Sequence, residues 1–195
     1  MPDSPARPLT DAEHAARSYS DPVFWAEEVC GLKPTPQQTE LLRAVALPGA
    51  HVAAASGHGT GKTVSLAILA LWFLATRDNA IVPCTAPTAA QLQDVMWREI
   101  RASIRRMTPW MRDQFSVTKD KVEIKGSAGM VVARTARPEN PDALQGFHGD
   151  NLLFIIDEAA GVNEKVYEVA YGALSTNKAR VVCTGNPTSL SGFFY

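Results

Sequence analysis

The sequence lacks the features that mark several protein classes. Its 195 residues include three cysteines, Cys30, Cys84 and Cys183, which are far apart and show neither the paired spacing of a zinc site nor a disulfide framework. Cys84 and Cys183 stand in apolar runs, which predicts buried free thiols in a reducing compartment. The N-terminus has no apolar signal core, and the apolar run at residues 66–75 is too short to span a bilayer. These absences predict a soluble cytosolic protein without a membrane partner.

An excess of charge of either sign is also missing. Lysine and arginine number 19 against 20 acidic residues, for a formal net charge of −1. This balance excludes a strongly basic protein that coats nucleic acid, so any DNA contact must be local. The length fits one full hydrophobic core better than two. Residues 1–22 contain four prolines and several charges, which predicts a mobile leader followed by one domain over residues 23–195.

The most informative stretch is HVAAASGHGTGKT at residues 51–63. A strand-like apolar run breaks into a glycine-rich turn, and an apolar run long enough for a helix follows. The glycines let successive N–H groups turn inward around an anion, and a helix beginning near Gly61 adds its own free N–H groups. Lys62 would then reach the outer phosphates, and the Thr63 hydroxyl would hold Mg²⁺. The alternative is a surface turn with a chance lysine, since the P-loop pattern G-x-x-x-x-G-K-[ST] places glycine where Ser56 stands.

This stretch predicts a nucleoside triphosphate site. The nucleotide-binding residues that it implies are Ser56, Gly57, His58, Gly59, Thr60, Gly61, Lys62 and Thr63.

Residues 152–158 supply a second half for such a site. Five consecutive apolar residues are typical of a central parallel strand, and Asp157 and Glu158 follow directly. If this strand ends near the P-loop, Asp157 lies beside the Mg²⁺ and Glu158 orients and deprotonates the attacking water. Alternatively, the two acids only end a strand with solvated charge. Adjacent Asp and Glu in this place indicate the RecA-like and helicase-like group of P-loop ATPases.

Alternating apolar segments predict an α/β fold, with a mostly parallel central sheet and helices on both faces. A final strand at 179–184 leads into Thr184, Gly185 and Asn186, which could bond the γ-phosphate or the lytic water; a plain turn is the alternative. Pro83 predicts an edge position or a bulge for the strand at 79–85. Helices are expected at 22–31, from 37 onward, after the P-loop, at 89–107 with Leu92, Val95, Met96 and Ile100 inward, and at 164–174; further strands are expected at 118–125 and 130–134.

The motifs PTPQQTELLRAV, SGHGTGKT, TAPTAAQ, GFHGDNLLFIIDEAA and CTGNPTSLSGFFY follow one another in an order that resembles the large terminase subunit of tailed bacteriophages, over residues 24–195. That protein is the motor that pumps double-stranded DNA into an empty capsid. The resemblance implies a P-loop NTPase of the RecA/helicase-like (ASCE) class that uses ATP and Mg²⁺ in the cytoplasm of a host bacterium. It also implies a portal protein and a small terminase subunit as partners, and a ring of identical subunits, with a monomer as the alternative for this chain alone.

The resemblance also assigns roles to residues. Gln38 matches the glutamine that reads adenine, with Gln37 as the alternative. Asp157 and Glu158 match the metal-binding and catalytic acids, and Thr184, Gly185 and Asn186 match the motif that couples hydrolysis to movement. Gln145 stands where some members offer an arginine finger to a neighbouring subunit, so the candidates become Arg134, Arg137 or another basic residue. The family's nuclease domain has no counterpart here, which predicts a truncated ATPase domain.

Three arginines indicate where DNA would touch. Arg98, Arg101 and Arg105 are spaced i, i+3 and i+7, hence on one helix face, and such a face can follow phosphates without reading sequence. The alternative is an ordinary solvated helix face. Two other functions stay open on the sequence: a helicase-like nucleic-acid-dependent ATPase, and a nucleotide-binding module with little turnover of its own.

Overall fold

A single mixed sheet organises the computed structural model, which describes residues 7–57, 59–135, 146–172, 178–187 and 194. In this described part the sheet has seven strands in the order β1-β7-β6-β2-β5-β4-β3. The first five strands in this order run parallel, and β4 and β3 add an antiparallel edge. The mostly parallel sheet is therefore confirmed. The strands are β1 (His51–Ala55), β2 (Ile81–Thr85), β3 (Phe115–Val117), β4 (Lys121–Ile124), β5 (Met130–Ala133), β6 (Leu153–Ile156) and β7 (Arg180–Gly185).

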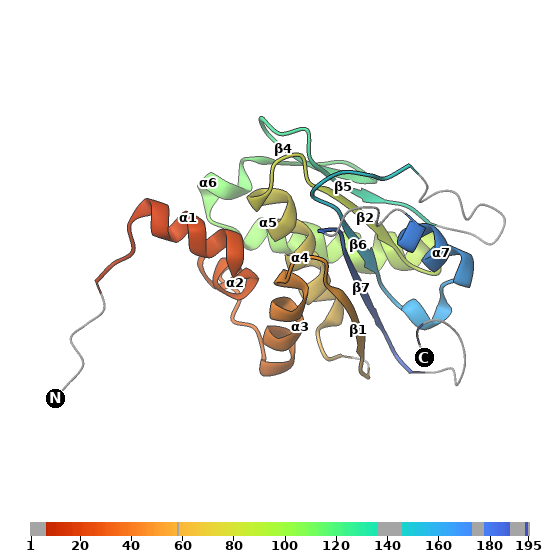
Figure 1. Ribbon diagram of the computed structural model, residues 1–195. Helices are drawn as coiled ribbons and strands as arrows, with labels where there is room; N and C mark the ends of the chain where they lie inside the picture. Colours follow the sequence, from red (N-terminus) through yellow and green to blue (C-terminus); the bar gives the residue numbers. More distant parts are fainter. Residues whose placement is uncertain (1–6, 58, 136–145, 173–177, 188–193, 195) are drawn as a thin grey trace.

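Helices cover both faces of this sheet (Figure 1). They are α1 (Asp11–Ser20), α2 (Pro22–Cys30), α3 (Pro36–Ala46), α4 (Lys62–Thr76), the π-helix η1 (Gln91–Trp97), α5 (Arg98–Arg106), α6 (Pro109–Arg112), the 3-10 turn η3 (Ala159–Gly161) and α7 (Glu164–Gly172). Helix α4 is apolar along most of its length because other helices and the sheet surround it. Among the described residues, no helix combines the length and apolar character needed to cross a bilayer.

The alternation of side chains in β6 shows how the two faces divide. Leu153 and Ile155 join the larger core, which α2 to α5 and η1 build on one face. Leu152, Phe154 and Ile156 join a smaller core on the other face, beneath α7 and η3. Successive side chains of a strand point to opposite faces, so a strand covered on both sides must be apolar throughout. This explains the continuous apolar run that precedes Asp157.

The predicted mobile leader is wrong for residues 11–20, which form α1. Thr10 caps this helix through a capping box with Glu13, a local signal that favours helix formation. The helix is also held to the domain, since the Trp72 indole donates a hydrogen bond to the Ser18 carbonyl at 2.7 Å. Residues 1–6 lie outside the described residues.

The predicted edge position of the strand containing Pro83 is also wrong, because β2 lies between β6 and β5. On the β6 side, the Ile81 N–H donates to the Asn151 carbonyl and the Thr85 carbonyl accepts from the Asp157 N–H, each at 2.9 Å. Pro83 faces the same side, so its missing N–H removes one bond from the β2–β6 ladder. The pairing there is interrupted between the bridge at residue 81 and the pairs at residues 84 and 85. The short ladder accommodates proline in a central strand.

The predicted helix at 89–107 is present as two consecutive elements, η1 and α5. Leu92, Met96 and Ile100 are buried as expected, but Val95 is 40% exposed and Trp97 is fully buried in its place. A π-helix bonds i to i+5 and so needs more residues per turn than an α-helix. The buried face therefore moves by about one position, which an α-helical pattern does not anticipate.

Candidate nucleotide-binding site

Three neighbouring parallel strands end at one edge of the sheet, and a predicted motif follows each of them. β1 leads into the P-loop, β6 into Asp157 and Glu158, and β7 into Asn186. The loops are joined by the Ser56 N–H, which donates to the Gly185 carbonyl at 3.1 Å. The carboxyl edge of a parallel α/β sheet is the usual place for ligands in such folds. The fold thus brings together motifs that are about 100 residues apart in the sequence.

Backbone and hydroxyl contacts fix the P-loop itself. Gly61 has φ +79°, a left-handed conformation that favours glycine, and a Cβ at this position would lie 2.5 Å from the amide nitrogen of Gln38 and so displace that side chain. Ser56, which stands in place of the pattern's first glycine, uses its hydroxyl to hydrogen-bond Thr60 at 2.8 Å. The Thr60 hydroxyl in turn donates to the Gly57 carbonyl at 3.2 Å. The departure at Ser56 therefore adds a cross-link within the loop. His58 lies outside the described residues.

The Lys62 ammonium lies inside this loop. It donates to the carbonyls of Ser56 and Gly57, both at 2.7 Å, and to the Asn186 side-chain oxygen at 3.0 Å. All three acceptors are neutral, and within the part of the chain that the structure describes no carboxylate pairs with the lysine. An anion with several oxygens, such as a phosphate, is a stronger partner for the ammonium than any of the three.

Asp157 is almost fully buried, at 4% exposure, and both of its carboxylate oxygens are engaged. The Thr63 hydroxyl lies 3.2 Å from Oδ2, while Oδ1 accepts from the Thr184 hydroxyl at 2.9 Å and from the Glu158 N–H at 3.0 Å. Burial, and after it the Asp157 carboxylate, raises the pKa of the neighbouring Cys84 thiol. Asp157 is thus held on one oxygen while the other faces the first turn of α4.

Glu158 has an unusual backbone conformation. Its φ and ψ are +49° and +45°, in the left-handed region that residues other than glycine and asparagine rarely adopt. Such local strain occurs at functional sites, where the surrounding structure holds it in place. Within the described residues its carboxylate has no hydrogen-bond or ion-pair partner, and the residue is partly exposed. A free carboxylate next to the Asp157 site is able to bind and orient a water molecule.

Both the oxygen and the nitrogen of the Gln38 side-chain amide form hydrogen bonds within the protein. Its oxygen accepts from the Thr35 N–H at 2.9 Å, completing a capping box at the start of α3, and its nitrogen donates to the Gly61 carbonyl at 3.1 Å. Gln37 is exposed and, in the part of the chain that the structure describes, has no hydrogen-bond partner. Both residues line a groove of about 610 Å³ between α3 and β1, which continues to Lys62 in the P-loop. This groove has room for a nucleotide base beside the phosphate loop.

The other predicted residues lie outside this cluster. Arg134 follows β5; its guanidinium donates a hydrogen bond to the Ala133 carbonyl and lies 3.8 Å from the Asp120 carboxylate. Arg137 and Gln145 lie outside the described residues. Arg98, Arg101 and Arg105 all lie on α5. Arg101 donates to the Thr118 carbonyl at 3.0 Å, whereas Arg98 and Arg105 are exposed and make no ion pair within the described residues.

Sequence reasoning missed Tyr167 in α7. Its hydroxyl donates to the Ala159 carbonyl at 2.6 Å and so fixes the turn η3 that follows the two acids. Burial raises the pKa of this hydroxyl, which remains protonated and able to donate. The sequence signal was weak, since a tyrosine on the inner face of an amphipathic helix usually only fills a core.

Comparisons with known proteins agree with this geometry. A family model described as an AAA domain matches residues 33–192. The probable terminase large subunit of Enterobacteria phage P7 is 34% identical over 180 residues, which are 90% of this chain and 36% of that protein. The chain therefore spans about a third of the length of this curated relative.

Solved structures show the same fold. A point variant of the Thermus phage P74-26 large terminase ATPase domain has a TM-score of 0.66 at 20% identity, covering 86% of this chain and 70% of that one. The large terminase of a thermophilic bacteriophage, solved in complex with ADP, has a TM-score of 0.56 at 14% identity, covering 90% of this chain and 39% of that one. The chain belongs to the AAA domain family, and within that family it resembles the large terminase subunits of phages, as its motifs indicated.

Proposed function

We propose that this chain is the ATP-hydrolysing motor domain of a DNA-packaging terminase, which drives double-stranded DNA into a procapsid. The observation that carries the proposal is the junction at the sheet edge, where the end of β7 contacts both halves of the nucleotide site. The Thr184 hydroxyl donates a hydrogen bond to the Asp157 carboxylate, and the Asn186 side-chain oxygen accepts one from the Lys62 ammonium. A strand end that contacts both groups is suited to transmit changes at the phosphates to the rest of the protein. The similarity to the P7 protein supports the assignment to packaging.

The residues at the site fit a magnesium–ATP complex. Mg²⁺ is usually held by one or two protein oxygens together with substrate phosphates and water. The Thr63 hydroxyl and the Asp157 carboxylate, 3.2 Å apart, offer two such oxygens. Among the described residues, no cluster of three or more His, Cys, Asp or Glu side chains is placed to hold a metal ion. When bound, Mg²⁺ neutralises charge on the phosphate oxygens.

The chain's own residues then divide the work. Lys62 exchanges its three neutral acceptors for phosphate oxygens, and the free N–H groups at the start of α4 bind the same anion. Glu158 orients the attacking water and accepts its proton as the γ-phosphate bond breaks in line. Thr184 positions Asp157. We assign adenine recognition to the α3–β1 groove, through Gln37 or through Gln38 after it releases Gly61.

Assembly would complete the motor. An arginine from a neighbouring subunit, with Arg134 and Arg137 as candidates, would stabilise the transition state, and such a residue is worth about 10³–10⁵ in rate. The working form would then be a ring at the portal, with the small terminase subunit as a second partner, in the host bacterial cytoplasm. Arg98, Arg101 and Arg105 on α5 would contact DNA phosphates.

Two substitutions test the nucleotide site. Glu158→Gln keeps the size of the side chain and removes the base, so we expect ATP binding close to the parent chain and turnover lowered by at least about 10². Lys62→Ala removes the cation from the phosphate loop, so both binding and turnover should fall. Fluorescent ATP-analogue titration and steady-state phosphate release measure the two effects. Parental turnover in Glu158→Gln would contradict the assignment of the base.

The DNA-binding face is tested by charge reversal. Arg98→Glu combined with Arg105→Glu should lower DNA stimulation of the ATPase rate and the salt dependence of DNA binding, because two phosphate contacts are lost. Arg43→Glu on α3, also exposed, is the matched control and should leave both unchanged. Unchanged stimulation in the α5 double variant would remove this face from the proposal. DNA-stimulated hydrolysis accompanied by strand separation would instead favour a helicase-like enzyme.

A further inference from the structure

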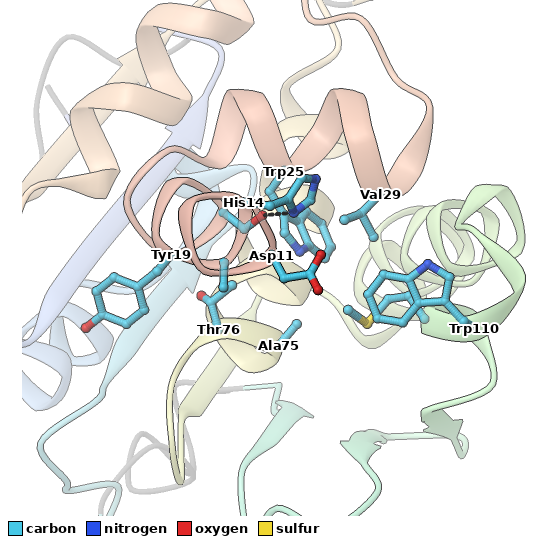
Figure 2. A pocket seen from close by; sticks show the side chains of 11 residues that line it. Asp11, His14, Tyr19, Trp25, Val29, Ala75, Thr76 and Trp110 are labelled. Carbon is cyan, nitrogen blue, oxygen red and sulfur yellow. Dashed lines mark hydrogen bonds between the residues drawn. The ribbon is translucent and has the colours of Figure 1, made fainter. Parts of the chain in front are cut away.

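A groove distant from the nucleotide site lies between α1, α2, the end of α4, and α6 (Figure 2). Its volume is about 580 Å³. Its lining includes Asp11, His14, Tyr19, Trp25, Trp110 and Met111. We call it the α1–α6 groove.

Two of the most exposed aromatic side chains among the described residues line this groove. Trp110 is 62% exposed and Tyr19 is 52% exposed, whereas Trp25 beside them is buried at 1%. Exposed tryptophan and tyrosine next to a concave apolar surface are typical of the residues that dominate binding energy at protein interfaces. The exposed indole of Trp110 contributes little to the folding core and is accessible to a partner.

The groove is built on elements that are held firmly. The Trp72 indole in α4 bonds the Ser18 carbonyl of α1 at 2.7 Å. Arg77 donates to the Tyr19 carbonyl at 3.3 Å and stacks on the Tyr19 ring, with 4.6 Å from its guanidinium carbon to the ring centroid. One face of Tyr19 is therefore covered by the protein itself. A preformed groove loses little conformational entropy when it binds a ligand.

The charge in the groove has one sign. Figure 2 shows the Asp11 carboxylate between the indoles of Trp25 and Trp110, and within the described residues it has no hydrogen-bond or ion-pair partner. His14 also lines the groove; its Nε2 atom lies 3.9 Å from a Glu28 carboxylate oxygen and its Nδ1 atom lies 3.5 Å from the Ser18 hydroxyl. No lysine or arginine of the described chain lines the groove. An unpaired carboxylate beside exposed indole rings complements a cation.

We propose that the α1–α6 groove docks a segment of a partner protein that presents an arginine or lysine beside an apolar residue. The cation lies over the face of Trp110 and pairs with Asp11, and the apolar residue packs against Met111 and Trp25. The groove is at the opposite end of α4 from Lys62. Since α4 has 15 residues, the two sites are about 22 Å apart at about 1.5 Å per residue. A docked partner therefore leaves the nucleotide site open, and binding in the α1–α6 groove does not depend on ATP hydrolysis.

Peptide titrations with the whole chain test this docking. The probes are acetyl-Ala-Leu-Arg-Leu-Ala-amide and the same peptide with glutamate in place of arginine, and the readout is the indole N–H resonance of Trp110. We expect the arginine peptide to shift this resonance with a Kd of about 1 mM or tighter and the glutamate peptide to shift it much less. Asp11→Asn should weaken arginine-peptide binding about twofold to fivefold, since an exposed ion pair is lost. Trp110→Ala, read through the remaining groove resonances, should abolish it.

Leu47→Ala is the matched control, because Leu47 is 65% exposed and does not line the groove; it should bind the arginine peptide as the parent chain does. Equal shifts with the two peptides, or no shift of the Trp110 resonance, would overturn the proposal. Shifts that depend on protein concentration would assign the groove to a second copy of the chain. Binding that appears only after deletion of residues 1–6 would assign it to the chain's own N-terminus. Either result would overturn the partner named here.

Discussion

Thr184→Val is the substitution that most directly tests how the end of β7 acts on the nucleotide site. The Thr184 hydroxyl is completely buried and donates to Asp157 at 2.9 Å. Valine has nearly the same shape, but it places a methyl group where the hydroxyl was. A distance of 2.9 Å is shorter than the roughly 3.5–4.0 Å of a favourable carbon contact, so the carboxylate must move. Thr63 then loses its alignment with the other oxygen of Asp157.

The size of the effect follows from these contacts. A hydrogen bond to a charged group contributes about 1.5–3 kcal/mol. Because the Glu158 N–H still donates to the same Asp157 oxygen, we expect the lower end, about 1.5 kcal/mol off the free energy of unfolding. Loss of a group that orients a metal ligand typically costs about 10–100-fold in metal affinity or activity. The Mg²⁺ concentration for half-maximal ATPase activity should therefore rise about tenfold or more.

Thr85→Val provides a matched control. Thr85 ends β2, which lies on the other side of β6 from β7, and it is buried at 1% exposure, but within the described residues its hydroxyl has no hydrogen-bond partner. Replacing an unsatisfied buried hydroxyl with a methyl group should leave the free energy of unfolding unchanged or increase it by about 1 kcal/mol. The two variants thus make the same chemical change at the ends of the two strands that flank β6, with and without a carboxylate partner.

The assays are urea unfolding and phosphate release as a function of Mg²⁺ concentration. Thr184→Val should lower stability and shift the Mg²⁺ dependence, whereas Thr85→Val should do neither. If the two variants behave alike in both assays, the Thr184–Asp157 hydrogen bond does not position the acid, and the role assigned to β7 fails.

Two further predictions concern the rest of the fold. A Cβ on Gly129 would lie 2.9 Å from the Ala80 backbone, so Gly129→Ala should lower the free energy of unfolding in urea by about 1–3 kcal/mol. A Cβ on Gly172 would meet no atom of the neighbouring described elements within 4 Å, so Gly172→Ala should change this free energy by less than about 0.5 kcal/mol, and equal effects would contradict the importance of packing at Gly129. Burial raises the pKa of Cys30 and of Cys183 to about 12. At pH 8 only about one such thiol in ten thousand is therefore ionised, and Ellman's reagent should react with neither cysteine until urea is added. Rapid labelling of the native chain would show that these sites open.

Short-range patterns were sufficient to predict the local structure of the segments that meet at the candidate site. Local conformation can be predicted for three segments: the glycine turn before Lys62, the apolar run before Asp157 and the strand before Asn186. This is possible because backbone freedom and burial on both faces act over a few residues. The fold class follows from the alternation of such segments. The capping signals at Thr10 and Thr35 are also local, although the first of them was overlooked in predicting a leader.

Contacts between distant segments decided the rest. The bond between Lys62 and Asn186 joins residues 124 positions apart, and the placement of β2 in the sheet centre depends on its neighbours β5 and β6, which overrode the preference of Pro83 for an edge. Gln38 contacts Gly61 only because α3 packs beside the P-loop. A local pattern constrains backbone angles and the faces of each element. The order of strands and the partners of each polar side chain depend on how all the elements share one core, and only the tertiary structure contains that information.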